Sequence, residues 1–278
     1  MKSPACTHAG DFFFMDPNLN ELLKVANEMA DAARVATLQF FRGNALATEN
    51  KETDGGFDPV TLGDRAAERA MRDVLAVRRP DDGIFGEEFG KSSGATGLTW
   101  VLDPIDGTRA FVCGMASWGV LISVEDDNGP LLGIIDQPYL EERFIGCGMS
   151  GELEWRGGTR PLRARTGVAL EDALLLTTFP EIGTDEERVG FERVRDQVKL
   201  TRYGLDCYGY ALLALGQVDL VIEAGLSAYD ISAPVAVIQS AGGVVTDWQG
   251  NPCHGGGRVL AAGSRELHEE ALALLVQA

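Results

Sequence analysis

Residues 100–108 read Trp100-Val101-Leu102-Asp103-Pro104-Ile105-Asp106-Gly107-Thr108 and carry most of the information about this chain. The first three are apolar and predict a buried strand. Asp103 and Asp106 follow at its exit, where a charge is costly unless something neutralises it. One aspartate in such a place is most often a turn or capping residue. Here a proline stiffens the turn, and both carboxylates project toward one centre, beside the backbone carbonyl of Ile105.

These groups predict a metal site next to an anion site. Carboxylates and a carbonyl form an oxygen-only ligand set, which suits a hard cation, Mg²⁺ before Ca²⁺ or Mn²⁺. Gly107 and Thr108 are expected to open a short helix, whose unbonded N–H groups can hold an anion. A metal ion beside such a cradle indicates phosphate chemistry.

Two more carboxylate segments lie in apolar surroundings. Gly86-Glu87-Glu88 follows the strand-like Ile84-Phe85, and Ala228-Tyr229-Asp230-Ile231-Ser232-Ala233-Pro234 leads into a helix that ends at Ala241-Gly242-Gly243. Two other motifs fail. The segment 86–92 has too few residues between its glycines for a phosphate-binding P-loop, and 146–151 fits the dinucleotide pattern but is followed by alternating residues, which predict a hairpin turn.

Composition excludes several classes of protein. With 42 acidic and 24 basic residues the formal net charge is −18, which argues against a nucleic-acid-binding surface and against a polybasic membrane-surface protein. No apolar run is long enough to span a membrane. The 5 cysteines form no C-x-x-C pair, and 3 histidines are too few for a His-rich zinc site, so we expect a cytoplasmic protein without a disulfide framework.

The length of 278 residues predicts one large or two ordinary domains. We expect a loose extension at 1–17, in which Met15 is an alternative start site, an α+β domain at 18–155 with an antiparallel sheet, and an α/β domain at 156–278. The elements expected in the first domain are a helix over 22–40 that Gly43 ends, a polar loop at 44–59, a helix at 62–79 capped by Thr61, and strands at 84–86, 100–102, 119–124, 131–136 and 143–146. Those expected in the second are strands at 174–178, 220–223, 244–248 and 259–262 and helices at 185–198, 206–215, 231–241 and 265–276.

Together, the segments 86–88, 103–108 and 229–243 resemble the inositol monophosphatase family of Mg²⁺-dependent phosphatases, in that family's order and spacing, from about residue 20 to the C-terminus. The resemblance implies a layered αβαβα fold and a homodimer. Within the family, the chain is most similar to the histidinol-phosphatase branch at 107–111, Trp118-Gly119, 203–210, 219–226 and 243–248.

The resemblance also implies a ligand set for two to three Mg²⁺ ions. Glu87, Asp103 and the Ile105 carbonyl would bind the first ion. Asp103, Asp106 and Asp230 would bind the second, and Glu87 would share a looser third. Two ions about 3.5–4 Å apart would clamp the phosphate between them.

Catalytic roles follow from the same resemblance. Thr108, paired with Asp64, would orient and deprotonate the attacking water, and the N–H groups of Gly107 and Thr108 would hold phosphate oxygens. Asp230 would help to protonate the leaving alkoxide, and no phosphoenzyme would form. The alternative for Asp64 is a carboxylate in the first turn of a helix, stabilised by the helix dipole.

The leaving-group pocket is implied to contain Glu223 and Asp206, whose carboxylates suit the ammonium and imidazole of histidinol. The expected reaction is therefore hydrolysis of L-histidinol phosphate, a phosphate monoester, in histidine biosynthesis. Asp206 has the alternative of a helix N-cap, and Lys51 either helps to order the metal site or is solvated. The chain departs from inositol-type enzymes at Arg109, Cys113 and Ala228.

Other interpretations of the sequence keep the same family but change the substrate or remove the activity. The same chemistry could act on inositol 1-phosphate, a sugar bisphosphate or an adenosine bisphosphate, although the last would favour a strongly basic pocket that the sequence does not provide. A catalytically silent relative that binds or regulates is a different class, and the presence of every implied ligand argues against it.

Overall fold

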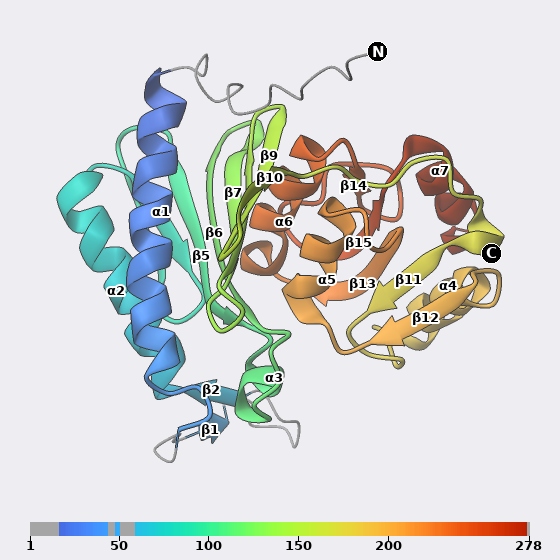
Figure 1. Cartoon of the computed structure of the whole chain (residues 1–278), viewed down its shortest axis with the longest axis horizontal. Coiled ribbons are helices and arrows are strands. Elements are labelled where there is room, and N and C mark those ends of the chain that lie inside the picture. Colours follow the sequence, from blue (N-terminus) through green and yellow to red (C-terminus); the bar gives the residue numbers. More distant parts are fainter. Residues whose placement is uncertain (1–16, 44–47, 51–58, 277–278) are drawn as a thin grey trace, which may run out of the picture.

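The computed structural model describes residues 17–43, 48–50 and 59–276. Its elements form five layers (Figure 1). Helices α1 (Pro17–Leu38) and α2 (Leu62–Arg78) cover the outer face of a large sheet, α5 (Asp206–Ala214) and α6 (Ala228–Ser240) lie between that sheet and a smaller one, and α4 (Asp185–Arg195) and α7 (Arg265–Leu275) cover the far side. The expected layered αβαβα fold is therefore confirmed.

The large sheet has 8 strands in the order β10-β9-β8-β7-β6-β5-β3-β4. All its neighbours are antiparallel except β3 and β5, which are parallel. Hairpin turns after Asp126 and Cys147 join consecutive strands, and the second of them is the turn predicted at 146–151. Its strands are β3 (Gly83–Gly86), β4 (Gly90–Ser92), β5 (Thr99–Asp106), β6 (Gly119–Asp126), β7 (Gly129–Gln137), β8 (Glu142–Cys147), β9 (Ser150–Trp155) and β10 (Gly158–Pro161).

The smaller sheet has 5 strands in the order β12-β11-β13-β15-β14. Strand β11 pairs in parallel with both β12 and β13, and β15 pairs antiparallel with both β13 and β14. Its strands are β11 (Leu174–Thr177), β12 (Leu200–Tyr203), β13 (Leu220–Leu226), β14 (Val244–Thr246) and β15 (Gly257–Ala262). Two short strands, β1 (Thr48–Asn50) and β2 (Pro59–Thr61), pair beside the short helix α3 (Thr108–Val112).

Several predicted boundaries were wrong. Helix α1 ends at Leu38, and a turn follows in which Arg42 has a φ of 58°, a left-handed conformation that cannot continue the helix. Strand β5 continues beyond Leu102 to Asp106, because Asp103 and Asp106 still pair with β6 across an irregularity between them. Helix α6 begins three residues earlier than expected, which places Asp230 in its first turn.

Helix α6 packs on the large sheet at unusually close range. A Cβ atom at Gly133 would lie 2.4 Å from the carbonyl oxygen of Ala233, and one at Gly146 would lie 2.5 Å from that of Ala236. Only glycine leaves room for the helix backbone at these two points. The contact holds the N-terminus of α6, and with it Asp230, beside the end of β5.

The core between the two sheets draws on both halves of the chain. Leu121, Ile135 and Phe144 from the large sheet belong to the same buried cluster as Tyr210 and Ile231. Strand β10, at residues 158–161, joins the large sheet. The division into domains at residue 155 stays a prediction.

No helix in the described ranges is both long and apolar enough to cross a membrane. The cysteines of the described chain, Cys113, Cys147, Cys207 and Cys253, form no disulfide. Lys51, Cys6 and Met15 lie outside the described residues.

Candidate active site

A cavity of about 390 Å³ opens where the ends of β3 and β5 face α3, the N-termini of α5 and α6, and the end of β13. Strands of both sheets and three helices therefore contribute to it. Of the site residues expected from the sequence, all those that the structure describes line this cavity except Asp64, which lies beside Thr108. The lining members are Glu87, Asp103, Ile105, Asp106, Gly107, Thr108, Asp206, Glu223 and Asp230.

Three of these carboxylates form the first acidic cluster. Asp103, Asp106 and Asp230 each place one oxygen atom within 4.8 Å of those of the other two. The N–H of Ile105 donates to Oδ1 of Asp103 at 3.0 Å, and the N–H of Ser227 donates to Oδ2 of Asp230 at 2.7 Å. These bonds to the backbone orient two of the carboxylates before any ligand binds.

Burial and mutual repulsion disfavour the ionised forms of the carboxylates in the first cluster. Burial, and then the negative charges of its neighbours, Glu87 first, hold the pKa of Asp103 well above its usual value. Burial and the charges of Asp206 and Asp230 do the same to the pKa of Asp106. The N–H of Cys207, which donates to Asp106 at 2.6 Å, opposes the shift but does not cancel it. A cation at this position would stabilise the ionised carboxylates.

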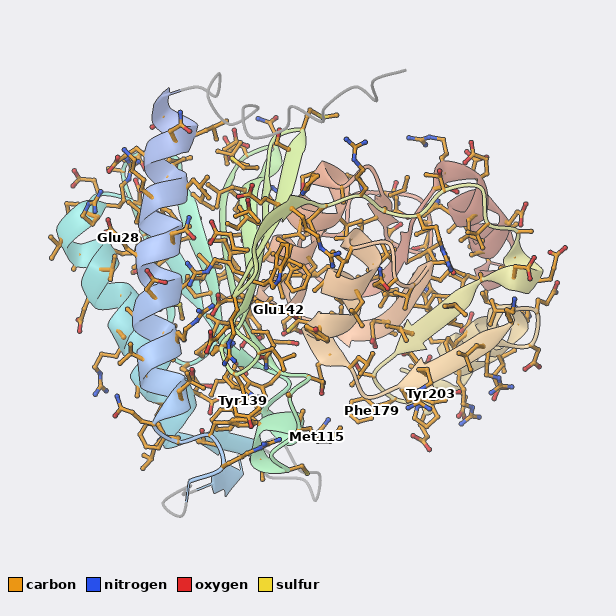
Figure 2. The ribbon with its side chains drawn as sticks, in the orientation of Figure 1. Glu28, Met115, Tyr139, Glu142, Phe179 and Tyr203 are labelled. Carbon is orange, nitrogen blue, oxygen red and sulfur yellow. The ribbon has the colours of Figure 1, made fainter. Side chains whose placement is uncertain are left out.

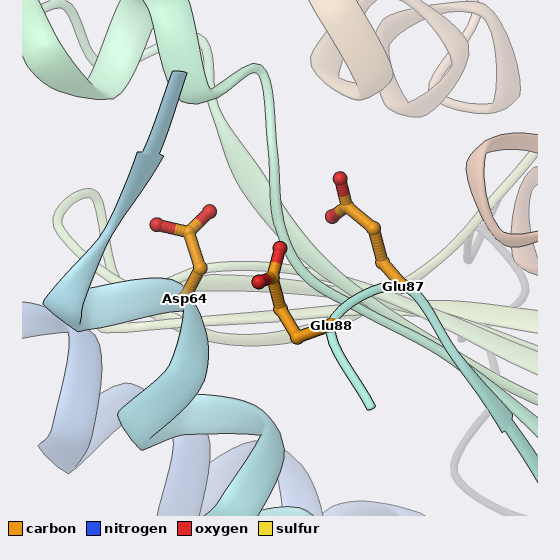
Figure 3. A group of neighbouring side chains, drawn as sticks. All are labelled: Asp64, Glu87 and Glu88. Atoms are coloured by element: carbon orange, nitrogen blue, oxygen red, sulfur yellow. The ribbon is translucent and has the colours of Figure 1, made fainter. Parts of the chain in front are cut away.

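A second acidic cluster contains Asp64, Glu87 and Glu88, again with one oxygen atom of each within 4.8 Å of the others (Figure 3). The turn that carries both glutamates rests on the buried Glu68. Its carboxylate accepts the N–H of Glu88 at 2.6 Å and that of Phe89 at 3.2 Å.

Gly86 is required by this arrangement. A Cβ atom at residue 86 would lie 2.0 Å from Oε1 of Glu68. Arg72 donates to that same oxygen at 2.8 Å and holds the Glu68 side chain in place. The glycine that opens the Gly86-Glu87-Glu88 segment therefore lets a buried carboxylate fasten the turn.

Asp64 joins the start of α2 to Thr108. Oδ2 of Asp64 accepts the N–H and the hydroxyl of Thr61, at 2.8 and 2.5 Å, in a capping box. Oδ1 lies 3.3 Å from the hydroxyl of Thr108, which is also 3.1 Å from the carbonyl oxygen of Ile105. Burial outweighs the bonds from Thr61 and raises the pKa of Asp64 to about 6.

Asp206 lines the cavity from the N-terminus of α5. The N-cap of α5 is Leu205, so the interpretation of Asp206 as that cap was wrong. Asp206 is the first residue of the helix, with a φ of 47°. Its side chain passes so close to Gly107 that a Cβ atom there would lie 2.9 Å from Cγ. Burial raises the pKa of Asp206 to about 6, against the opposing effects of Ser117 and Arg109.

Glu223, on β13, completes the carboxylate lining. Its side chain accepts the N–H and the hydroxyl of Thr178, at 2.7 and 2.9 Å, and the hydroxyl of Thr177 at 3.3 Å. Burial raises the pKa of Glu223 to about 7 in spite of these bonds. Asp206 and Glu223 thus add two carboxylates to a cavity that already holds Glu87 and the first acidic cluster.

At the rim of the cavity, the guanidinium of Arg109 lies over the ring of Phe179 at 5.1 Å. Figure 2 labels Phe179 in the lower part of the molecule. Of the other two departures noted in the sequence, Cys113 is exposed at the end of α3 and Ala228 begins α6.

Comparison with known proteins identifies the family of this chain. The model of the inositol monophosphatase family matches residues 18–278. The chain belongs to the inositol monophosphatase family. It is 38% identical to the bifunctional phosphatase IMPL2 of Arabidopsis thaliana, over 98% of this chain and 80% of that protein. It is 34% identical to the histidinol-phosphatase of Mycobacterium tuberculosis, over 91% of this chain and 97% of that protein.

Solved structures of the inositol monophosphatase family have the same fold. An inositol monophosphatase from Zymomonas mobilis is 40% identical and matches with a TM-score of 0.83, over 94% of this chain and 100% of that chain. Enzymes of the inositol monophosphatase family are metal-dependent phosphatases, and this chain is one of them.

The donor set fits the metal dependence of the inositol monophosphatase family. The acidic clusters offer only oxygen ligands, and the carboxylates of the first are held at raised pKa values by burial and by one another. Glu88 is the member that the sequence interpretation missed, although it stands next to Glu87 in the quoted segment. The signal that could have found it is the glycine before the pair, which predicts a turn rather than a regular strand.

Proposed function

We propose that this enzyme is a Mg²⁺-dependent histidinol-phosphatase, which hydrolyses L-histidinol phosphate to L-histidinol and phosphate. The observation that carries the proposal is that Asp206 and Glu223 line the same cavity as the metal-site carboxylates. Histidinol presents an ammonium and an imidazole, and ionised carboxylates make strong charge-assisted hydrogen bonds to such groups. Inositol offers only hydroxyl groups.

The pKa values support this choice of substrate. Asp206 has a pKa of about 6 and Glu223 one of about 7, so both are partly protonated near neutral pH. A cationic leaving group binds their ionised forms and draws both pKa values down. Arg109 is the single basic residue among those described around the cavity, which disfavours a nucleotide with two phosphates.

The metal ligands are proposed as the sequence implied them. Glu87, Asp103 and the carbonyl of Ile105 would hold one Mg²⁺, and Asp103, Asp106 and Asp230 a second, with a looser third at Glu87. Bound ions would polarise the phosphoryl oxygens and lower the pKa of a coordinated water. We propose that Glu88 also faces the position of the third Mg²⁺, because it lies with Glu87 in the second acidic cluster.

The protein's own groups would then move the protons. Thr108 accepts the proton of the attacking water while its own hydroxyl proton passes to Asp64, 3.3 Å away. A carboxylate whose pKa is about 6 is suited to this task near neutral pH. The N–H groups of Gly107 and Thr108 hold phosphate oxygens, and Asp230 helps to protonate the leaving alkoxide. Water attacks phosphorus directly, so no side chain is phosphorylated.

A second candidate keeps the chemistry and changes the substrate to inositol 1-phosphate. The 40% identity to the inositol monophosphatase of Zymomonas mobilis favours it. A homodimer and a cytoplasmic location remain predictions from the sequence.

The test measures phosphate release from histidinol phosphate, inositol 1-phosphate, fructose 1,6-bisphosphate and adenosine 3′,5′-bisphosphate, with Mg²⁺ and again with chelator. We expect turnover that the chelator abolishes and that is fastest with histidinol phosphate. Faster turnover of another substrate would overturn the substrate assignment and keep the metal site. Turnover that survives chelation would overturn the metal site itself.

A further inference from the structure

Tyr210 carries a buried hydroxyl that the proposed reaction does not yet use. Its side chain is 3% exposed and lines the cavity from α5. Within the part of the chain that the structure describes, the hydroxyl has no hydrogen-bond partner. Buried polar groups are hydrogen-bonded in the great majority of cases, so this one requires an explanation.

The hydroxyl lies among the carboxylates of the cavity. Asp206 and Tyr210 are four residues apart on one helix and therefore share a face. After burial, the charge of Glu223 is the largest cause that holds the pKa of Tyr210 well above its usual value, so the hydroxyl keeps its proton. The negative charges of Asp106 and Asp230 contribute to the same rise in pKa to a smaller extent.

Tyr208, two residues earlier on α5, provides the contrast. Its hydroxyl donates to Oε2 of Glu142 at 2.6 Å, and its ring packs at 83° to that of Phe144. Tyr208 thus fastens α5 to the large sheet with a satisfied hydroxyl. The same helix turns Tyr210 toward the cavity with a hydroxyl that no described residue satisfies.

We propose that the Tyr210 hydroxyl is a specificity-determining group that hydrogen-bonds a polar atom of the leaving group, between Asp206 and Glu223. This inference rests on the proposed function, because it assigns a third recognition group to the same pocket. A phenol both donates and accepts, so it can accept from an N–H of a cationic leaving group while its proton faces a neighbouring carboxylate. Substrate binding would give the Tyr210 hydroxyl a hydrogen-bond partner.

The test compares Tyr210→Phe with Tyr208→Phe. For Tyr210→Phe we expect KM for histidinol phosphate to rise about 10-fold, the effect of one lost hydrogen bond to a charged group, with a much smaller change in kcat. The melting temperature of the ligand-free variant should equal or exceed that of the wild type, because an unsatisfied hydroxyl is removed. Tyr208→Phe should lower the melting temperature and leave KM within twofold.

The experiment distinguishes failure of the proposed substrate from failure of the inference about Tyr210. If wild-type enzyme prefers another substrate of the panel, the proposed substrate is wrong, and KM of Tyr210→Phe is then measured with the preferred substrate. If KM for the preferred substrate is unchanged in Tyr210→Phe, or rises equally in Tyr208→Phe, the inference about Tyr210 is overturned while the phosphatase assignment stands. A fall in the melting temperature of ligand-free Tyr210→Phe would also overturn it, since the hydroxyl would then be stabilising the empty protein.

Discussion

The hydroxyl of Thr108 lies 3.3 Å from Oδ1 of Asp64, although 44 positions separate the two residues in the chain. The other oxygen of the same carboxylate caps α2 through Thr61. One side chain therefore caps the N-terminus of α2 and also faces the cavity-lining hydroxyl. The two interpretations of Asp64 that the sequence left open do not compete, since the capping role is observed and leaves Oδ1 available for the proposed catalytic role.

Thr108→Val should lower kcat by about 10²- to 10⁴-fold, the usual range for loss of a proton-transfer group, with a small change in KM. Valine has nearly the shape of threonine but cannot pass a proton to Asp64. Thr108→Ser keeps the hydroxyl and should lose less than tenfold. Steady-state kinetics with saturating Mg²⁺ checks both, and equal losses in the two variants would show that the hydroxyl is not the relevant group.

Asp103→Asn should abolish measurable activity while the fold remains. The wild-type carboxylate is buried among like charges that raise its pKa, so a neutral side chain should increase the melting temperature measured in chelator. Stabilisation by added Mg²⁺ should disappear. Asp127→Asn, at an exposed position in the turn after β6, is the matched control and should change none of these readouts. An active Asp103→Asn enzyme would refute the ligand assignment.

Asp206→Asn and Glu223→Gln should each reduce kcat/KM for histidinol phosphate by about 10- to 100-fold, since each removes a charged hydrogen-bond partner. The loss for inositol 1-phosphate should be much smaller, because that leaving group carries no positive charge. The ratio of the two kcat/KM values, measured side by side, is the informative quantity. A ratio that stays constant would mean that these carboxylates do not select the leaving group.

Glu223 should make the metal-free protein less stable as pH rises. Its pKa is about 7 in the folded chain and about 4.3 in an unfolded one. Between these values the folded state binds more protons than the unfolded state, so this residue's contribution to the free energy of unfolding falls with increasing pH. We expect Glu223→Gln to gain stability relative to wild type from about pH 4.5 to 7, as measured by urea unfolding in chelator. A difference that does not change with pH would contradict the raised pKa.

Gly86→Ala should destabilise the protein by about 1–3 kcal/mol, a typical cost of overpacking. The added methyl group would meet Glu68, which fastens the turn carrying Glu87 and Glu88. The Mg²⁺ concentration for half-maximal activity should rise as well, because that turn shifts. Gly255→Ala, where the added methyl group has open space, should alter neither quantity. An unchanged Mg²⁺ dependence in Gly86→Ala would show that the position of this turn does not affect Mg²⁺ binding.

Much of this protein could be predicted from local patterns. The capping of α2 by Thr61, the hairpin turn at 146–151 and the alternation of strands and helices depend on residues close together in the chain, and each was confirmed. The proximity of Asp103 and Asp106 was also predicted from the residues themselves, because a charge in an apolar segment requires a partner, and both belong to the first acidic cluster. Asp230 was placed with them only by the family resemblance.

Other features required the tertiary structure. The approach of Asp230 to Asp103 depends on α6 packing against Gly133 and Gly146. Glu88 lies close to Asp64 because Glu68 fastens the turn that carries Glu88. Local sequence determines which segments form helices, strands and turns, since those preferences act between neighbours. The distance between carboxylates on different elements is decided by how closely the backbones pack, and a pattern along one chain contains no measure of that.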